Sequence, residues 1–502
     1  MKRAFYLLLV LTGLLLRIED AAAIIAASGC ASPAPRAVRN IFYIDPAKGS
    51  MSNDGSLTRP WKTLAEVVDE KNKLIATQSY PGNYQNSDHK LSDQNPSAPI
   101  KPGDIIYLMS GDHGNVEILG AINKDFITVE AARNQTPTLR SLRVNGASKW
   151  MFVGLKVQGA GDGSTNSSPG AALVEFGRNL WRGPADNIIF TSGSVSTADD
   201  SNSWEDIDWV KKPFMKGLNY SATCVTIIGN HFYNLRDALG IDGDHSLVTD
   251  NKIEYFGNDG IDLIASHVVI RNNTIINGRH SNSEPMHADG IQGWTKNGQT
   301  NTDITIERNT IIKTGDPEKT YMQGITIFDG KWNGVRILNN VVVTNHWHGI
   351  SISGVVNGQI INNTVVAFDP AKHPTWIIVN KSKDGTPAQD IVVRNNITTR
   401  LVYHGDRIVV DHNIVAKMIS TDVSEKLVFF SKPGSYGDHN IIDPEIYDTL
   451  VKVDNSNGKY DLRLRQNSPA VGGGNAELAP TVDITGKPRA NPTDVGAYAY
   501  RN

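Results

Sequence analysis

The sequence is poor in several features that define common protein classes. It has only two cysteines, Cys30 and Cys224, in 502 residues, which excludes a framework of disulfides and a CxxC zinc site. Lys and Arg number 49 against 52 Asp and Glu, so no basic excess points to a nucleic acid partner. No segment after the N-terminal apolar run is long and apolar enough to cross a bilayer. We expect Cys224 to be a small apolar residue of the core.

Residues 1–30 predict an export signal, because Lys2 and Arg3 precede a short apolar run over 4–16. Two cleavage sites remain open. Ala21-Ala22-Ala23 suits an ordinary signal peptidase, whereas Ala27-Ser28-Gly29-Cys30 resembles a bacterial lipobox. On the second interpretation Cys30 carries lipid and tethers the protein to a membrane. We therefore expect an exported protein that is periplasmic, anchored to the outer membrane as a lipoprotein, or secreted.

Short β-branched runs that end in asparagine recur along the chain. The terminal residues are Asn230, Asn251, Asn273, Asn309, Asn340, Asn363 and Asn396, at spacings of 21, 22, 36, 31, 23 and 33 residues. The short spacings suit one coil of a solenoid and the long ones a coil with a loop. Asparagine tolerates the left-handed backbone of tight bends, and stacked asparagines can hydrogen-bond from coil to coil.

A Gly-Ile pair recurs in a second strand of each coil, at Gly240-Ile241, Gly260-Ile261, Gly290-Ile291, Gly324-Ile325 and Gly349-Ile350. The alternative, a β-sandwich, would join its antiparallel strands by hairpin turns. The pattern predicts an all-β fold, a single-stranded parallel β-helix with two strands per coil. We expect a linker and N-terminal cap at 31–105 with a short helix over 65–68, the β-helix at 106–445 and a closing segment at 446–502.

The two ends carry a resemblance to a known family. Tyr43-Ile44-Asp45-Pro46, Trp61-Lys62-Thr63 and the closing Asp494-Val495-Gly496-Ala497-Tyr498 resemble the start and end of secreted bacterial proteins of the pectate-lyase-like superfamily. The resemblance spans residues 41–500 and implies a right-handed parallel β-helix. It does not identify a substrate, because function belongs to sites rather than folds.

Alignment on the glycines places polar side chains in columns that run from coil to coil. One outward column holds Asp242, Asp262, Gln292, Thr326 and Ser351, and the next holds Asp244, Ile264, Trp294, Phe328 and Ser353. A third column, at the start of each strand, holds Leu239, Asp259, Asp289, Gln323 and His348, and its direction stays open.

The acidic residues of these coils suit calcium-assisted β-elimination on a uronic-acid polymer, in which a cation neutralises the carboxylate while a base removes the adjacent proton. We expect Asp237, Asp259 and Asp262 to bind Ca²⁺, with Asp242 as a further ligand. Asn258-Asp259-Gly260-Ile261-Asp262 resembles the calcium-binding coil Asp-Asp-Gly-Phe-Asp of one group of pectate lyases. The resemblance places that group's catalytic lysine at Gln292, which is a departure. The candidate catalytic residues are then Asp289, His287, Lys296, Tyr321 and His348, and the candidate substrate-binding residues are Gln292, Trp294, Phe328 and His346.

Other functions remain open. Asp259 and Asp289 on neighbouring coils suit an inverting glycoside hydrolase, and their motif order is similar to that of the polygalacturonases, although Ala288 replaces the first acid of the second motif. C5 epimerisation or glycan binding without cleavage would use the same polar columns. Trp204-Glu205-Asp206-Ile207-Asp208-Trp209 is expected to be a surface loop beside the cleft. We predict a monomeric lyase that acts on an acidic polysaccharide with Ca²⁺.

Overall fold

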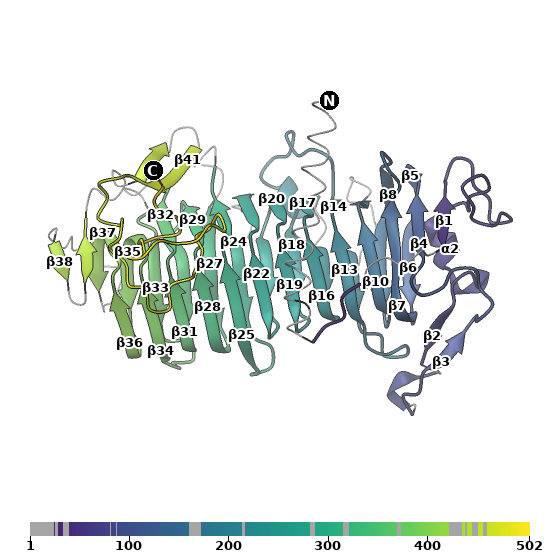
Figure 1. Ribbon diagram of the computed structural model, residues 1–502, viewed down its shortest axis with the longest axis horizontal. Coiled ribbons are helices and arrows are strands. Elements are labelled where there is room, and N and C mark those ends of the chain that lie inside the picture. The colour runs from purple at the N-terminus through teal and green to yellow at the C-terminus, as the bar shows by residue number, and fades with distance from the viewer. Residues whose placement is uncertain are drawn as a thin grey trace.

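The computed structural model describes residues 25, 29–33, 40–80, 82–86, 88–159, 172–212, 216–281, 287–314, 321–368, 373–420, 434–436, 439–443, 450–454 and 459–501. Over these residues the chain forms a parallel β-helix, as predicted. Figure 1 shows the strands stacked side by side along the long axis, from β1 at the purple end to β38 at the yellow-green end.

One sheet takes a single strand from each coil, and nearly all its pairings are parallel. Its strands in stacking order are β1 (Ile41–Ile44), β4 (Ile105–Leu108), β7 (Ile122–Ala131), β10 (Ser148–Val153), β13 (Asp186–Thr191), β16 (Thr223–Ile228), β19 (Ser246–Thr249), β22 (Val268–Arg271), β25 (Thr300–Glu307), β28 (Lys331–Leu338), β31 (Val355–Ile361), β34 (Ala388–Arg394) and β36 (Gly405–Asp411). The small strands β2 (Thr77–Ser79) and β3 (Ser92–Gln94) pair antiparallel beside it.

The second sheet bends, so that each coil adds two strands to it. We call the first set the short row. It comprises β5 (Gly111–Asp112), β8 (Pro137–Leu139), β11 (Lys156–Gln158), β14 (Ser194–Ser196), β17 (His231–Leu235), β20 (Lys252–Phe256), β23 (Thr274–Gly278), β26 (Thr310–Ile312), β29 (Val341–Thr344) and β32 (Thr364–Ala367). The prediction of two strands per coil was therefore wrong, because the short row follows the bend at once and lacks a separate signal.

We call the other set the site row. It comprises β6 (Asn115–Leu119), β9 (Ser141–Asn145), β12 (Ala172–Gly177), β15 (Lys216–Tyr220), β18 (Asp237–Ile241), β21 (Asp259–Leu263), β24 (Ala288–Trp294), β27 (Met322–Asp329), β30 (His348–Ser353) and β33 (Trp376–Asn380). Both rows meet in β35 (Ile397–Tyr403), followed by β37 (Ile414–Ser420), β38 (Gly434–Tyr436) and β39 (Asn440–Ile442).

The predicted asparagine ladder is confirmed at the bend between the first sheet and the short row. Each Nδ2 donates to the Oδ1 of the next ladder residue at 2.9–3.1 Å, and the ladder continues through Asn413 to Asn440. The left-handed backbone belongs to the residue before each ladder asparagine, for example Asp250, Asn272 and Arg308. The ladder residues are therefore selected for their buried amide groups rather than for their backbone angles.

The N-terminal end of the solenoid is closed by the expected short helix, α2 (Leu64–Val68). Thr63 caps it, because its Oγ1 accepts from the backbone N–H of Glu66 and donates to the Glu66 carboxylate. Two 3₁₀ turns, η1 (Glu70–Asn72) and η2 (Tyr84–Asn86), follow. Leu64 and Val67 pack into the same apolar core as the coils, so the helix covers the open end of that core.

The C-terminal residues return over the coils instead of extending the solenoid. After the antiparallel pair β40 (Leu450–Asp454) and β41 (Lys459–Leu464), the chain to residue 501 lies across the short row, as the yellow trace in Figure 1 shows. Val341 and Val366 pack there with Ala470 and Val495 in a second apolar cluster. Asn362 Nδ2 also donates to the carbonyl oxygen of Asp494 at 2.8 Å.

Cys30 and Cys224 form a disulfide with their Cα atoms 5.5 Å apart. The expectation that Cys224 is an apolar core residue was therefore wrong. The bond uses the sulfur that a lipid would need, so the structure does not support a tether through Cys30. The predicted export signal lies mostly outside the described residues. Among those that are described, no helix has the length and apolar character to span a membrane.

Candidate functional site

The site row brings the predicted acidic residues together, with one change of register. Asp262, Gln292, Thr326 and Ser351 lie in one column, as predicted. Asp242 does not belong to it, because Gly240 is the residue in register with Asp262. The third column consequently contains Asp237 rather than Leu239, and it runs from Lys216 through Asp237, Asp259 and Asp289 to Gln323.

The wrong register has a physical cause, since two kinds of glycine share the Gly-Ile signature. Gly260 faces the core, where an added Cβ would lie 3.0 Å from Ile275. Gly240 faces the other way, and an added Cβ would lie 2.4 Å from Asn219 Oδ1. Only the first kind marks the corner of a coil.

The corner glycine also settles the open direction of the third column. Gly260 and Ile261 both contact the core, which interrupts the usual alternation of a strand. Asp259 and Asp262 therefore leave β21 on the same side, away from the apolar interior. Together with Asp237 they each offer an oxygen within 4.8 Å of the others.

These three aspartates form a buried acidic cluster. Asn258 Nδ2 donates to Asp237 Oδ1 and to Asp259 Oδ2, each at 2.7 Å. Burial, together with the charge of Asp262, raises the pKa of Asp237 to about 6 and that of Asp259 well above its usual value. Asp262 Oδ1 is buried and has no hydrogen-bond partner among the described residues. Such an orphaned carboxylate oxygen fits a hard cation that takes oxygen ligands.

Lys216 is a member of this site that the sequence did not reveal. Its Nζ lies 2.6 Å from Asp262 Oδ2. Burial alone would lower the pKa of Lys216, but the charges of Asp262, Asp237 and Asp259 outweigh it and raise the pKa. Lys216 therefore stays an ammonium in the cation-free site.

Asp289 lies on the next coil, in register with Asp259. Its backbone N–H donates to Asp259 Oδ1 at 3.1 Å, and Thr326 Oγ1 donates to Asp289 Oδ1 at 3.0 Å. Burial raises the pKa of Asp289 to about 8, against the opposing hydrogen bond from Thr326. Asp289 therefore holds a proton at neutral pH.

Further along the site row, histidines and aromatic rings gather. The rings of His346 and His348 are 5.3 Å apart, and Phe328 and Trp376 lie 4.9 and 5.2 Å from His348. Trp376 was not predicted, because variable loops hide its register. Burial lowers the pKa of His346 to about 3 and that of His348 to about 4, so both are neutral at pH 7.

The tautomers of this histidine pair follow from its partners. The indole N–H of Trp376, which can only donate, contacts His348 Nδ1 at 3.0 Å. The backbone N–H of His348 donates to His346 Nδ1 at 3.3 Å. Each Nδ1 is thus an acceptor, and each neutral ring carries its proton on Nε2. His348 consequently offers a hydrogen-bond donor rather than a free basic nitrogen.

The remaining predicted residues lie around these two groups. His287 is exposed, with its ring 5.8 Å from that of His346, and Tyr321 is exposed against His373. Lys296 pairs with Asp242 at 2.6 Å instead of contacting the acidic cluster.

Trp294 falls in register with Asp329 rather than with Phe328, because the pairing shifts after Gly293. The expected column of Trp294 and Phe328 was therefore wrong.

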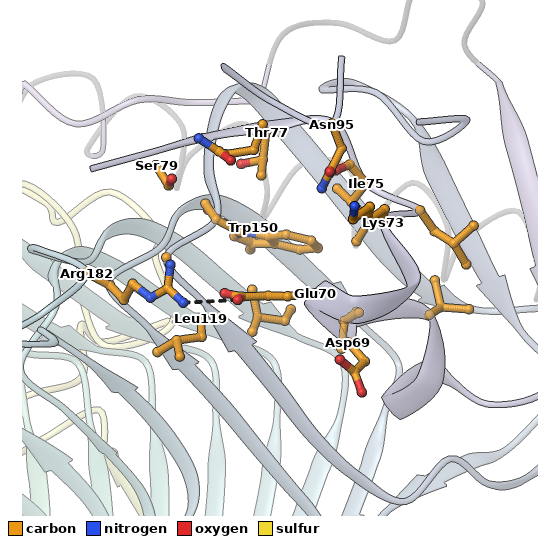
Figure 2. Close-up of a pocket in the computed structure, with 17 residues that line it drawn as sticks. Asp69, Glu70, Lys73, Ile75, Thr77, Ser79, Asn95, Leu119, Trp150 and Arg182 are labelled. Atoms are coloured by element: carbon orange, nitrogen blue, oxygen red, sulfur yellow. Dashed lines mark hydrogen bonds and ion pairs between the residues drawn. The ribbon is translucent and has the colours of Figure 1, made fainter. Parts of the chain in front are cut away.

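Two cavities differ in whether predicted site residues line them. One of about 510 Å³ is lined by Asp242, Asp244 and Ile264, and Ile264 is two residues beyond Asp262. The other, of about 230 Å³, lies in the N-terminal cap, where Glu70 and Arg182 pair at 3.0 Å beside Trp150 (Figure 2). None of the predicted site residues lines the cap cavity.

The inserted loop over 201–212, which includes α3 (Asp208–Lys211), lies against the same side of the coils. Trp209 is buried, and its backbone approaches Gly257, next to Asn258. Ser281 Oγ donates to Asp206 Oδ2 at 2.9 Å, which fixes the loop to the coil of β23. The loop is therefore packed next to the turn that carries Asn258.

A family model described as a right handed beta helix region matches residues 216–367. These coils form a right-handed β-helix. The matched span contains the acidic cluster, Asp289 and the histidine pair.

Several solved structures are similar to this one at low identity. Pectate lyase Pel9A is 14% identical, covers 93% of this chain and 97% of its own, and has a TM-score of 0.46. XylC, in complex with xylose, is 10% identical with coverage of 92% and 99% and a TM-score of 0.46. PfbA, a surface adhesin of Streptococcus pneumoniae, is 11% identical with coverage of 67% and 84% and a TM-score of 0.39. No curated protein sequence matches the chain. These similarities assign no activity to this β-helix.

Proposed function

We propose that the protein is an exported polysaccharide lyase that cleaves a glycan containing uronic acid by β-elimination with Ca²⁺. The observation that carries the proposal is the buried cluster of Asp237, Asp259 and Asp262, in which Asp262 Oδ1 lacks a partner among the described residues. When ionised, the three carboxylates outnumber the ammonium of Lys216, and a divalent cation would offset the remaining negative charge.

The donor set suits calcium because it consists of carboxylate oxygens. Calcium takes six to eight oxygen ligands, so three aspartates leave positions for the carboxylate of a substrate. When bound there, the cation would neutralise that carboxylate and make the neighbouring proton easier to remove. Asn258 holds Asp237 and Asp259 in place through its two hydrogen bonds.

The residues of this chain supply the remaining steps. His287 is the base of the proposal, because its imidazole is exposed and it precedes Asp289 by two residues at the start of β24. The Nε2–H groups of His346 and His348 hydrogen-bond to substrate oxygens, and Phe328 offers an aromatic face to a sugar ring. Gln292 Nε2 lies 3.4 Å from Asp289 Oδ2, and Tyr321 packs against His373. The cavity at Asp242 and Asp244 extends the binding face beyond Asp262.

The direct test is the chemistry of the product. Elimination leaves an unsaturated uronate that absorbs in the ultraviolet, so the protein should produce this absorbance on a panel of acidic glycans with Ca²⁺ and lose it with a chelator. Asp259→Ala and Asp262→Ala should both abolish the activity together with its calcium dependence. Unchanged activity in both variants would refute the site.

One observation favours glycoside hydrolysis as the second candidate. Asp259 and Asp289 are direct neighbours across two coils, and Asp289 holds a proton, as the acid of a hydrolase must. New reducing ends without the ultraviolet absorbance would support this function over elimination. A panel that yields neither product would point to glycan binding without cleavage.

A further inference from the structure

Lys216 reaches the acidic cluster along a route that the fold keeps open. It opens β15 in register with Asp237, and its Nζ ends 2.6 Å from Asp262 Oδ2, two coils away. Gly240 stands between them, in register with Asn219 on one side and Asp262 on the other. A Cβ at position 240 would lie 3.2 Å from Lys216 Nζ and would overlap Asn219 Oδ1. The missing side chain therefore leaves room for the lysine.

A second lysine of the same face provides a comparison. Lys296 pairs with Asp242 at the same distance, 2.6 Å, but their side chains are 46% and 31% exposed. The side chains of Lys216 and Asp262 are 21% and 3% exposed. A buried pair interacts through less water, and removal of one partner leaves an uncompensated charge, whereas an exposed pair contributes little.

The charges around Lys216 exceed what it can neutralise. The charges of Asp262, Asp237 and Asp259 all act on the ammonium, and Arg236 is a further cation near Asp237. Lys216 takes Asp262 Oδ2, and the other oxygen, Oδ1, is the buried atom without a partner among the described residues. Asp262 thus presents one oxygen to the lysine and one to the space that the proposed cation would enter.

We propose that Lys216 is the internal counter-ion of the cation site: it holds the three aspartates together in the cation-free protein and weakens the binding of the divalent cation by its own charge. The inference rests on the proposed function for the identity of the cation. Lys216 is a positioning residue, and the room for it is provided by Gly240. The site would consequently bind Ca²⁺ reversibly without losing its shape when the cation leaves.

The test measures calcium binding and stability in the full chain. Calorimetric titration with CaCl₂ at one fixed pH should show Lys216→Met binding Ca²⁺ several-fold more tightly than the unaltered protein, because one positive charge has left the site. In chelator, Lys216→Met should unfold at a lower temperature, and saturating CaCl₂ should remove most of that difference.

The controls separate charge from packing. Lys216→Arg keeps the charge and should retain the calcium affinity of the unaltered protein, and Lys296→Met should leave affinity and stability unchanged. If Lys216→Met does not fold, the double variant Lys216→Met/Asp262→Asn should fold, because both charges are gone. Failure of the double variant to fold would overturn the counter-ion role.

The outcomes distinguish this inference from the proposed function. Weaker or equal calcium binding in Lys216→Met, while the unaltered protein binds, overturns the inference and leaves the calcium site standing. Absence of calcium binding in both proteins refutes the proposed calcium site. A loss of stability in chelator for Lys216→Met, restored in the double variant, still supports the counter-ion role in that case.

Discussion

The protonation of Asp289 leads to a prediction about how stability depends on pH. Its carboxyl is buried one coil from Asp259, and its pKa is raised from 3.8 to about 8. A raised pKa means that the folded protein binds the proton more tightly than the unfolded chain. This contribution to stability is complete below about pH 4 and is lost as the pH rises to about 8. Asp289→Asn replaces the protonated carboxyl by a neutral amide of similar shape, so it should remove this loss.

The magnitude follows from the shift. Each pH unit between the two pKa values changes the free energy of unfolding by up to about 1.4 kcal/mol, so from pH 5 to pH 8 the variant should gain up to about 4 kcal/mol relative to the unaltered protein. Entry of water around the charged carboxylate reduces this figure, and we expect a gain of at least about 2 kcal/mol. Asp237 and Asp259 are present in both proteins, so the difference reports on Asp289.

Urea denaturation at pH 5, 7 and 8 in the presence of a chelator is the assay, with the free energy extrapolated to water. Thr326→Val is the companion variant, because it removes the hydrogen bond that opposes the shift. Without that bond the pKa of Asp289 should rise further. The fall in unfolding free energy with increasing pH should therefore continue to a higher pH in Thr326→Val than in the unaltered protein. If the free energies of unfolding of Asp289→Asn and the unaltered protein differ by the same amount at all three pH values, the reasoning is refuted.

Three further predictions follow from the fold and the site. Asn273→Ala removes four side-chain hydrogen bonds in the ladder and should cost about 3–5 kcal/mol of unfolding free energy at about 1 kcal/mol each, whereas the exposed Asn333→Ala should cost less than about 0.5 kcal/mol by urea denaturation. Non-reducing peptide mapping should find Cys30 linked to Cys224, and a lipid-modified Cys30 peptide would contradict the structure. Because the pKa values of His346 and His348 are lowered, the contribution of the two neutral rings to the unfolding free energy is complete above the ordinary histidine pKa. It is lost as the pH falls toward about 3. Nitrogen NMR at pH 5.5 should therefore show two neutral rings protonated on Nε2, and an imidazolium signal from either would be evidence against the tautomers.

The repeat could be predicted because stacking imposes the same requirement on every coil. A buried amide must meet another amide at one spacing, so the asparagines from Asn230 to Asn396 are visible in the sequence despite loops between them. The same holds for the core-facing glycines at 260, 290, 324 and 349, where any Cβ would meet the core. Repetition thus fixes the fold and the register of Asp262, Gln292 and Thr326.

The parts that escaped prediction depend on single contacts rather than on repetition. Gly240, like Gly260, is followed by Ile-Asp, but it faces the polar side. Alignment on the shared Gly-Ile-Asp therefore placed Asp242 in the column that Gly240 occupies. Lys216 is 46 residues from Asp262, and the sequence around either residue does not predict their ion pair. Cys30 meets Cys224 across 194 residues.

The return of the C-terminal residues over the short row bears on how the molecule is made. Val341, Val343 and Val366 pack in one apolar cluster with residues much later in the chain, among them Leu462, Ala470 and Val495. During synthesis these coils can stack and form the asparagine ladder while the outward-facing valines of the short row remain exposed to solvent. Docking of the chain after residue 459 over these valines is thus a late step of folding. A chain truncated before residue 459 would still contain the residues of the acidic cluster, but it would expose an apolar surface that chaperones and proteases recognise.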